Sequence, residues 1–234
     1  MPDNDTAAGR AETTLNDKVR SFLPSMGLPE ERRGRNRGSQ LTDAERELYR
    51  RILSTFASGN VPSREAVMVA AENSEQSGDK ALRRMVEIDL IQVSDDGAIM
   101  CAYPFSATPT GHDVVLDDGT LLHAMCAVDA LGIPAMLHRS CHISTSDPLN
   151  GAQIRLYVDA SGQVNADPPG AVVVSAVASG TGPLSSLCCP LLNTFESRAT
   201  AEEFLSRHPE LSSVILSLAD ASTWGAAVFG GVLG

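Results

Sequence analysis

The segment DVVLDDGTLLHAMCAVDALGIPAML, residues 113–137, changes its hydrophobic pattern half-way along and so predicts two kinds of structure. Its first half alternates around an Asp-Asp-Gly turn, which predicts two strands joined by a hairpin. Its second half, from Cys126 to Leu137, consists mostly of small and apolar residues and predicts a helix that ends or kinks near Pro134. Antiparallel hairpin strands combined with separate helices indicate an α+β fold.

Cys126 and Asp129 are the two chemically reactive residues of the predicted helix. Residues three apart in a helix lie on one face, so the thiol and the carboxylate are expected to be neighbours. If the helix starts close to Cys126, its free N–H groups and its dipole lower the pKa of the thiol and stabilise a thiolate. This pair alone is weak support for catalysis, because most free cysteines are small hydrophobic core residues.

The composition predicts a folded protein that does not use charge to bind nucleic acid or anionic membranes. The chain has 234 residues, 43% of them hydrophobic, and a formal net charge of −11. Phosphate groups are bound mainly by basic side chains, so this charge argues against a general affinity for nucleic acid. No apolar run approaches the roughly 18 residues of a membrane-spanning helix, and the N-terminus lacks a signal-peptide pattern. We therefore expect a cytoplasmic protein.

The cysteines are odd in number and irregularly spaced, which argues against a disulfide framework. They are Cys101, Cys126, Cys141, Cys188 and Cys189. The last two lie in SSLCCPLL, a β-prone run, and adjacent strand residues point to opposite faces, so at most one of their sulfurs can face Cys126. Two thiolates and one carboxylate suit a soft, thiophilic metal, whereas the absence of a Cys-x-x-Cys pattern argues against structural zinc.

The N-terminal third of the chain predicts an arm followed by a winged-helix-like helical region. Residues 1–40 contain the basic run ERRGRNRGS and are expected to form a flexible arm. Residues 41–103 predict three helices and then a hairpin in IQVSDDGAIMCAY; the helices are expected at about 42–57, 63–70 and 78–88. The third helix carries balanced charge, so a scaffold role is favoured over DNA binding.

The remaining residues, 104–234, predict a mixed α/β part with mainly antiparallel strands. Besides the hairpin of residues 113–125, strands are predicted in QIRLYVD, GQVNAD and GAVVVSAV. Two capping boxes mark helix starts, one formed by Thr42 with Glu45 and one by Thr200 with Glu203. The chain contains none of the common motifs for nucleotide binding, serine hydrolysis or zinc proteolysis.

Four stretches of the chain together resemble the organomercurial (alkylmercury) lyases of bacterial mercury-resistance systems. They are YPFSATPTGHDVVLDDGTLLHAMCAVDALGIPAMLHRS, NGAQIRLYVDASG, SSLCCPLLNTFES and AEEFLSRHPEL, of which CAVDALGIPAML and LCCP are the most specific. The resemblance runs from about residue 42 to 225 and makes residues 104–234 a lyase-like catalytic domain. It implies that Cys126, Asp129 and Cys188 are the catalytic residues and that they bind the mercury of the substrate and product.

The reaction that the resemblance implies is protonolysis of a carbon–mercury bond to a hydrocarbon and Hg(II). The thiolates of Cys126 and Cys188 would push electron density through mercury onto carbon, and Asp129 would handle the proton. No organic cofactor is expected. The implied partners are an organomercurial substrate and, for the Hg(II) product, small-molecule thiols or a mercuric reductase. Met125 stands where the family commonly has tryptophan, which bears on the range of organic groups accepted.

Two other hypotheses compete with the lyase. One is a winged-helix metal-sensing transcriptional regulator with a lyase-like metal-binding domain, and the other is an inactive fold in which all five cysteines are core residues. The basic arm favours the regulator, whereas the net charge and Asp129 favour the lyase, because a sensor needs no proton carrier. The sequence leaves open the preferred organic group, the oligomeric state and the roles of Cys101, Cys141 and Cys189.

Overall fold

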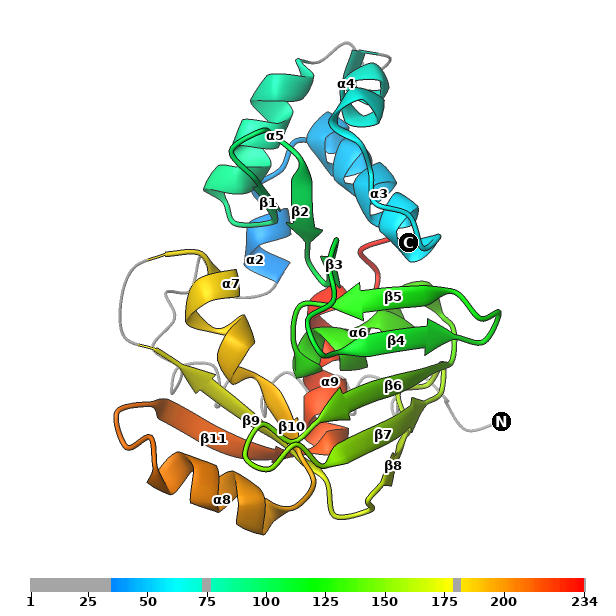
Figure 1. Ribbon diagram of the computed structural model, residues 1–234. Helices are drawn as coiled ribbons and strands as arrows, with labels where there is room; N and C mark the ends of the chain where they lie inside the picture. The colour runs from blue at the N-terminus through cyan, green and yellow to red at the C-terminus, as the bar shows by residue number, and fades with distance from the viewer. Residues whose placement is uncertain (1–34, 73–76, 179–181, 234) are drawn as a thin grey trace, which may run out of the picture.

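The computed structural model describes residues 35–72, 77–178 and 182–233. It confirms the α+β fold class: a group of helices forms one end of the molecule, and further helices pack against two antiparallel sheets (Figure 1). None of the described helices is both long and apolar enough to cross a membrane.

The N-terminal region is helical, as expected. Its helices are α2 (Arg35–Gly38), α3 (Asp43–Ala57), α4 (Arg64–Glu72) and α5 (Gly78–Glu87). The capping box at the start of α3 is confirmed, because Thr42 Oγ1 accepts from Glu45 N at 3.2 Å and Glu45 Oε2 accepts from Thr42 N at 2.8 Å. In α5, Leu82 and Met85 are buried in the core, whereas Val86 is exposed.

The N-terminal helices continue into an eight-stranded antiparallel sheet. Its strands are β1 (Ile91–Val93), β2 (Ile99–Ala102), β3 (Phe105–Ser106), β4 (Asp113–Leu116), β5 (Leu121–Ala124), β6 (Cys141–Ser146), β7 (Gln153–Val158) and β8 (Val164–Asp167), in the spatial order β1-β2-β3-β5-β4-β6-β7-β8. The hairpins β1–β2 and β4–β5 were predicted; β6 was not. The domain boundary expected after residue 103 falls between β2 and β3, which are hydrogen-bonded neighbours, and one hydrophobic core extends across it.

A second sheet has three strands, with β9 (Val172–Val177) between β10 (Asn193–Phe195) and β11 (Ser212–Ser217). Helix α8 (Arg198–Ser206) covers this sheet (Figure 1). The capping box of α8 consists of Ser197 and Thr200, so the predicted box of Thr200 with Glu203 is wrong by three residues. The sequence did not predict β10 or β11. A three-residue strand such as β10 is too short for an alternating pattern to show, and both strands are completed by pairing with β9.

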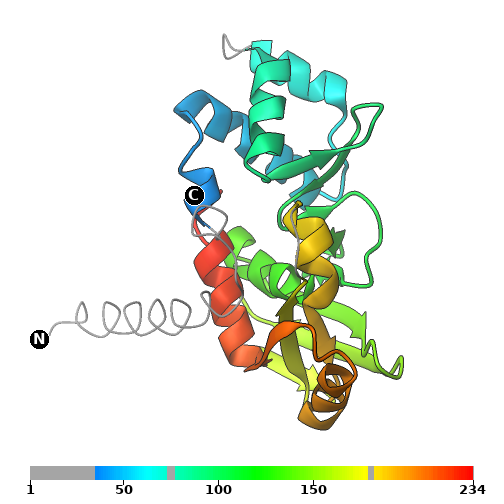
Figure 2. The same ribbon diagram turned by 90° about the vertical axis from the view of Figure 1, so that its left-hand side faces the viewer.

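Helix α6 (Ala127–Leu137) packs closely against α9 (Leu218–Phe229), a helix that the sequence did not predict (Figure 2). Pro134 lies inside α6 and does not end it, contrary to one of the two expectations. The two helices cross at Gly132 and Gly225, where a Cβ on Gly225 would lie only 2.7 Å from Gly132 N. Because only glycine leaves room for this approach, the pair of glycines sets the position of α6.

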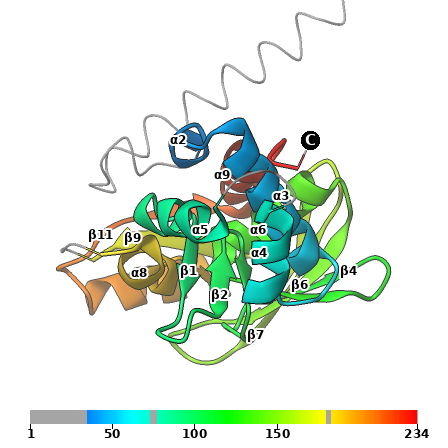
Figure 3. The ribbon, with the colours of Figure 1, turned by 90° about the horizontal axis from the view of Figure 1, so that it is seen from above.

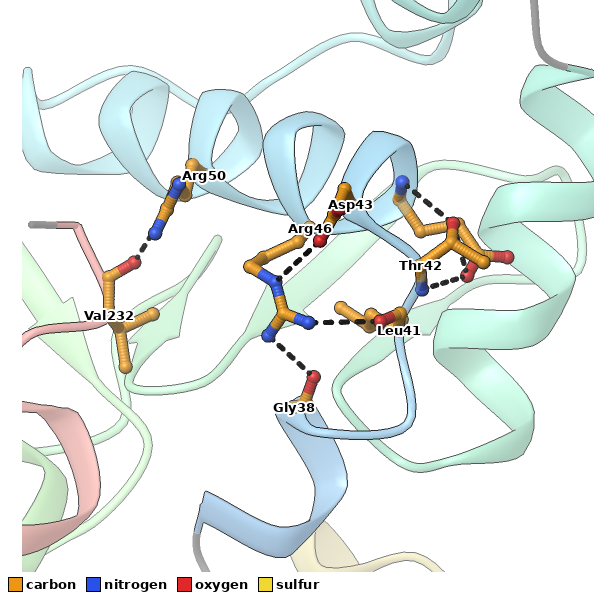
Figure 4. A network of polar contacts seen from close by, with 8 residues as sticks. Gly38, Leu41, Thr42, Asp43, Arg46, Arg50 and Val232 are labelled. Carbon is orange, nitrogen blue, oxygen red and sulfur yellow. Dashed lines mark hydrogen bonds and ion pairs between the residues drawn. The ribbon is translucent and has the colours of Figure 1, made fainter.

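Helix α2 lies beside the C-terminal end of α9, although the two come from opposite ends of the chain (Figure 2, Figure 3). Two arginines of α3 join these segments (Figure 4). Arg46 donates to the carbonyl oxygens of Gly38 at 3.2 Å and Leu41 at 3.0 Å, and Arg50 donates to that of Val232 at 3.1 Å. Both ends of the described chain are therefore hydrogen-bonded to the same helix.

The expected arm, residues 1–40, falls mostly outside the described residues, because nothing before residue 35 is described. Within the part of the arm that is described, Arg35–Gly38 form α2. The side chain of Arg37 is only 6% exposed. It therefore belongs to the interior of the protein, although Arg37 is part of the basic run.

Candidate active site

Cys126 is the N-cap residue of α6 and lies two residues after the end of β5. Its Sγ accepts a hydrogen bond from Asp129 N at 3.4 Å, and its thiol donates to Asp129 Oδ2 at 3.2 Å. Both side chains are buried. The structure thus places the thiol and the carboxylate in contact at a helix start, which is the local arrangement that the spacing of three residues predicted.

The pKa of the Cys126 thiol is raised well above its ordinary value, contrary to our expectation. Burial is the main cause, and the hydrogen bond with Cys189 and the negative charge of Asp129 act in the same direction. The hydrogen bond from Asp129 N does lower the pKa, as a helix N-terminus should, but burial outweighs it. The buried thiol therefore stays protonated and donates a hydrogen bond to Asp129.

The carboxyl group of Asp129 titrates near neutral pH. Burial raises its pKa from 3.8 to about 7, while the hydrogen bond from Cys126 and the positive charge of Arg37 oppose this rise. A group with this pKa can both accept and release a proton at physiological pH, as general acid–base catalysis requires. Asp129 is therefore suited to the proton transfer that the sequence predicted for it.

The double cysteine lies in a helical segment, so the predicted β-strand there is wrong. Cys188 separates the one-turn helix α7 (Leu184–Leu187) from the 3₁₀ turn η3 (Cys189–Leu191). The sulfurs of Cys126 and Cys189 and a carboxylate oxygen of Asp129 all lie within 4.8 Å of one another. The sulfur of Cys188 instead lies 3.9 Å from the carbonyl oxygen of Ala176 on β9.

The structure therefore brings Cys126 and Asp129 together but places Cys189, rather than Cys188, beside them. One sulfur of the pair faces Cys126, as expected. The two sulfurs point in different directions because the segment is helical, and not because residues alternate along a strand. A backbone hydrogen bond of 3.0 Å from Ala127 N to Leu192 O joins the start of α6 to the end of η3. This bond holds the two halves of the site side by side.

The remaining cysteines lie outside this cluster. Cys101 is on β2 and Cys141 on β6, and both are buried. Burial raises the pKa of each thiol to about 12. Both residues pack in the hydrophobic core as small side chains.

Residues 105–230, more than half of the chain, match the family model of MerB, alkylmercury lyase. This match contains the whole cluster formed by Cys126, Asp129 and Cys189. The chain belongs to the alkylmercury lyase family. Membership of this enzyme family confirms the resemblance that the sequence motifs suggested.

Curated relatives and a solved structure agree with this assignment. The alkylmercury lyase of Staphylococcus epidermidis is 28% identical over 178 residues, which are 76% of this chain and 79% of the relative. The alkylmercury lyase of Bacillus cereus is 27% identical, with coverage of 76% and 78%. The crystal structure of the mercury-bound form of MerB2 aligns with a TM-score of 0.71 at 20% identity, covering 84% of this chain and 94% of that one. At this identity the structural match supports the fold alone.

Sequence reasoning missed two buried charged residues near the site, and both lie outside residues 105–230, which match the family model. Arg37 donates through Nη1 to the main-chain oxygen of Asp89 and lies 3.7 Å from its Oδ2. Its guanidinium stacks over the ring of Tyr103 at 4.8 Å. The sequence contains no local signal for this buried pair, because Arg37 lies in the basic run and Asp89 follows a helix of balanced charge. Only the folded chain brings the two together.

Proposed function

We propose that this chain cleaves the carbon–mercury bond of organomercurial compounds by protonolysis, releasing a hydrocarbon and retaining Hg(II) on cysteine sulfur. The observation that supports this most is the buried cluster of two thiols and one carboxyl group, all within 4.8 Å, in a member of the alkylmercury lyase family. Sulfur ligands select soft metals, and mercury is among the softest. The carboxyl group provides the proton transfer that a metal-binding site alone would not need.

The hydrogen bond between Cys126 and Asp129 suggests the path of the proton. When mercury binds to Cys126, the thiol must lose its proton, and Asp129 Oδ2 is the acceptor already in place at 3.2 Å. Asp129, with a pKa of about 7, can then pass a proton to the carbon that leaves mercury. Two thiols and one organomercurial with its displaceable ligand thus give the hydrocarbon, the protonated ligand and Hg(II) bound by two thiolates. The carbon–mercury bond breaks with its electron pair on carbon.

The second sulfur in this proposal comes from the double cysteine. The family resemblance implies Cys188, and for this residue the thiol must turn away from the carbonyl oxygen of Ala176. The observed arrangement instead offers Cys189, which already lies beside Cys126 and Asp129. We propose Cys188 as the catalytic cysteine on the family pattern. Separate alanine variants of the two cysteines distinguish the assignments.

The activity is tested by incubating the protein with methylmercury and excess small-molecule thiol and measuring methane by gas chromatography. We expect methane and Hg(II) in equal amounts. The Cys126→Ala variant is the control for reactions of the free thiol. An intact wild-type protein that binds methylmercury stoichiometrically and releases no methane would contradict the proposed reaction.

The N-terminal region is proposed to be a structural cover for the catalytic part and not a DNA reader. Its strand β2 pairs with β3, and its helices share one hydrophobic core with the rest of the molecule. Residues 41–103 are therefore expected to be necessary for folding. Salt-sensitive, sequence-selective DNA binding at submicromolar affinity would instead favour the metal-sensing regulator.

The proposal includes a cytoplasmic site of action and transfer of Hg(II) to small-molecule thiols or a mercuric reductase, without an organic cofactor.

A further inference from the structure

Asp89 connects the N-terminal region to the double cysteine through hydrogen bonds. Its Oδ2 accepts from Leu184 N, the first amide of α7, at 2.9 Å. The carbonyl oxygen of Leu184 in turn accepts from Cys188 N at 2.8 Å. Asp89 therefore satisfies the first amide of the one-turn helix that directly precedes Cys188.

Arg37 holds the carboxylate of Asp89 in this orientation. The two side chains are 6% and 9% exposed, and the guanidinium is fixed by its hydrogen bond to the Asp89 main chain and by its contact with the ring of Tyr103. The backbone of Asp89 has a φ of 58°, in the left-handed region, which a residue other than glycine adopts only when its surroundings favour it. An ionised carboxylate is also a stronger acceptor for the amide of Leu184 than a neutral group.

A second contact connects the N-terminal region with the next residue of α7. Gln92, on β1, donates through Nε2 to the hydroxyl of Ser185. Two successive residues of α7 are therefore hydrogen-bonded to the segment of the N-terminal region that leads from α5 into β1. A region that only shielded a preformed site would not need hydrogen bonds to both of these residues.

We propose that Asp89, held by Arg37, is a positioning residue that fixes the double cysteine so that one of its sulfurs, that of Cys189 in this structure, lies beside Cys126. The N-terminal region then completes the mercury-binding site in addition to covering it. This inference rests on the proposed function in one respect, since it takes the double cysteine to supply the second mercury-binding sulfur. Asp89 acts through α7 and has no direct role in bond cleavage.

The test measures how tightly the protein retains Hg(II), which requires no turnover. Wild type and variants are loaded with one equivalent of mercuric chloride and titrated with 2-mercaptoethanol until half of the mercury is removed. Groups that orient metal ligands commonly change metal affinity by about 10- to 100-fold. We therefore expect Asp89→Ala to release mercury at roughly 10- to 100-fold lower thiol concentration. Asp89→Asn should lie closer to wild type, because its amide oxygen can still accept from Leu184 N.

Two further variants calibrate this measurement. Cys126→Ala shows the effect of losing one sulfur of the site outright. Asp79→Asn breaks an ion pair with Arg64 in the same N-terminal region, where the two side chains are about half exposed, and should retain mercury as wild type does. Equal retention in wild type and folded Asp89→Ala would overturn the proposal, as would an equal loss in Asp79→Asn.

Removing only Asp89 leaves Arg37 buried without its carboxylate, which is strongly destabilising and could prevent folding. The comparison is then made between the double variants Arg37→Met/Asp89→Ala and Arg37→Met/Asp89→Asn. Both lack the buried charges, and they differ in the acceptor for Leu184 N. Tighter retention by the asparagine variant supports the proposal, and equal retention overturns it. A wild type that retains Hg(II) yet releases no methane contradicts the proposed function but not this inference.

Discussion

The two halves of the candidate site differ in how the chain builds them. Cys126 and Asp129 are held by hydrogen bonds within one helical turn, at the start of α6. Cys188 and Cys189 lie between two short helical turns, and their placement depends on β9, on Asp89 and on the backbone contact between Ala127 and Leu192. A local pair can be predicted from spacing, whereas a pair held by distant segments cannot.

The comparison also separates the chemistry of the two halves. The pKa of Asp129 is moved to about 7, so the local half contains the group that can transfer protons. Burial raises the pKa of Cys188 to about 12, so that thiol stays protonated until a metal displaces the proton. We therefore expect substitution of Cys126 to affect mercury binding and substitution of Asp129 to affect proton transfer. Substitutions in the double cysteine should act mainly through mercury binding.

The largest effect is expected from Cys126→Ala. The variant loses the sulfur that contacts Asp129, so neither capture of the organomercurial at the site nor hydrocarbon release should remain. Single-turnover methane release and stoichiometric uptake measure the two steps. Cys141→Ala is the matched control, since Cys141 is an equally buried thiol outside the cluster. Cleavage by Cys126→Ala at a rate near that of the control would rule out its assignment as the primary mercury ligand.

The double cysteine provides the most direct test of the comparison. On the family pattern, Cys188→Ala should abolish cleavage, and Cys189→Ala should be mild. The observed geometry makes the opposite result meaningful, because the sulfur of Cys189 is the one beside Cys126. Methane release by the two variants, measured side by side, decides between them. An inactive Cys189→Ala with an active Cys188→Ala would show that the arrangement seen here is the working one.

Asp129→Asn should separate binding from chemistry. The sulfurs supply most of the affinity for a soft metal, so the variant should still take up methylmercury. Without a titrating carboxyl group its methane release should fall by about 10²- to 10⁴-fold, the usual contribution of general acid–base catalysis. If Asp129 merely capped α6, a role worth about 1 kcal/mol, asparagine would serve nearly as well and release would stay close to normal.

The smallest effect is a pH dependence of folding stability that Asp129 introduces. Its pKa is raised from 3.8 to about 7 on folding, so the folded protein binds this proton more tightly than the unfolded chain does. The stabilisation is fully present below the unfolded pKa and is lost as the pH rises through the folded pKa. Relative to Asp129→Asn, the wild type should therefore lose stability up to about pH 7 and change little above it.

Urea unfolding of both proteins between about pH 5 and 8 measures this difference. Asp118→Asn is a suitable control, because a hydrogen bond from Thr120 lowers the pKa of Asp118 to about 2, outside this range. Its stability difference from wild type should be constant over the same interval. A constant difference for Asp129→Asn as well would show that Asp129 stays ionised in the folded protein.

The elements that the sequence predicted well are those with local signals. The Thr42 capping box, the hairpins β1–β2 and β4–β5, and the start of α6 at Cys126 all depend on contacts within a few residues. The errors have a common cause. The strand predicted at the double cysteine is helical, and β10, β11 and α9 were missed, because these segments depend on pairing or packing with distant parts of the chain.

The sequence by itself determined that Cys126 and Asp129 would meet, because they are three residues apart at a helix start, where the N-cap side chain contacts the third helical residue. It also determined the family, through CAVDALGIPAML and LCCP. The tertiary structure alone decided which cysteine of the pair lies beside them, that Arg37 and Asp89 are buried together, and that the thiol pKa is raised. These properties depend on burial and on contacts between distant segments, which exist only once the chain has folded.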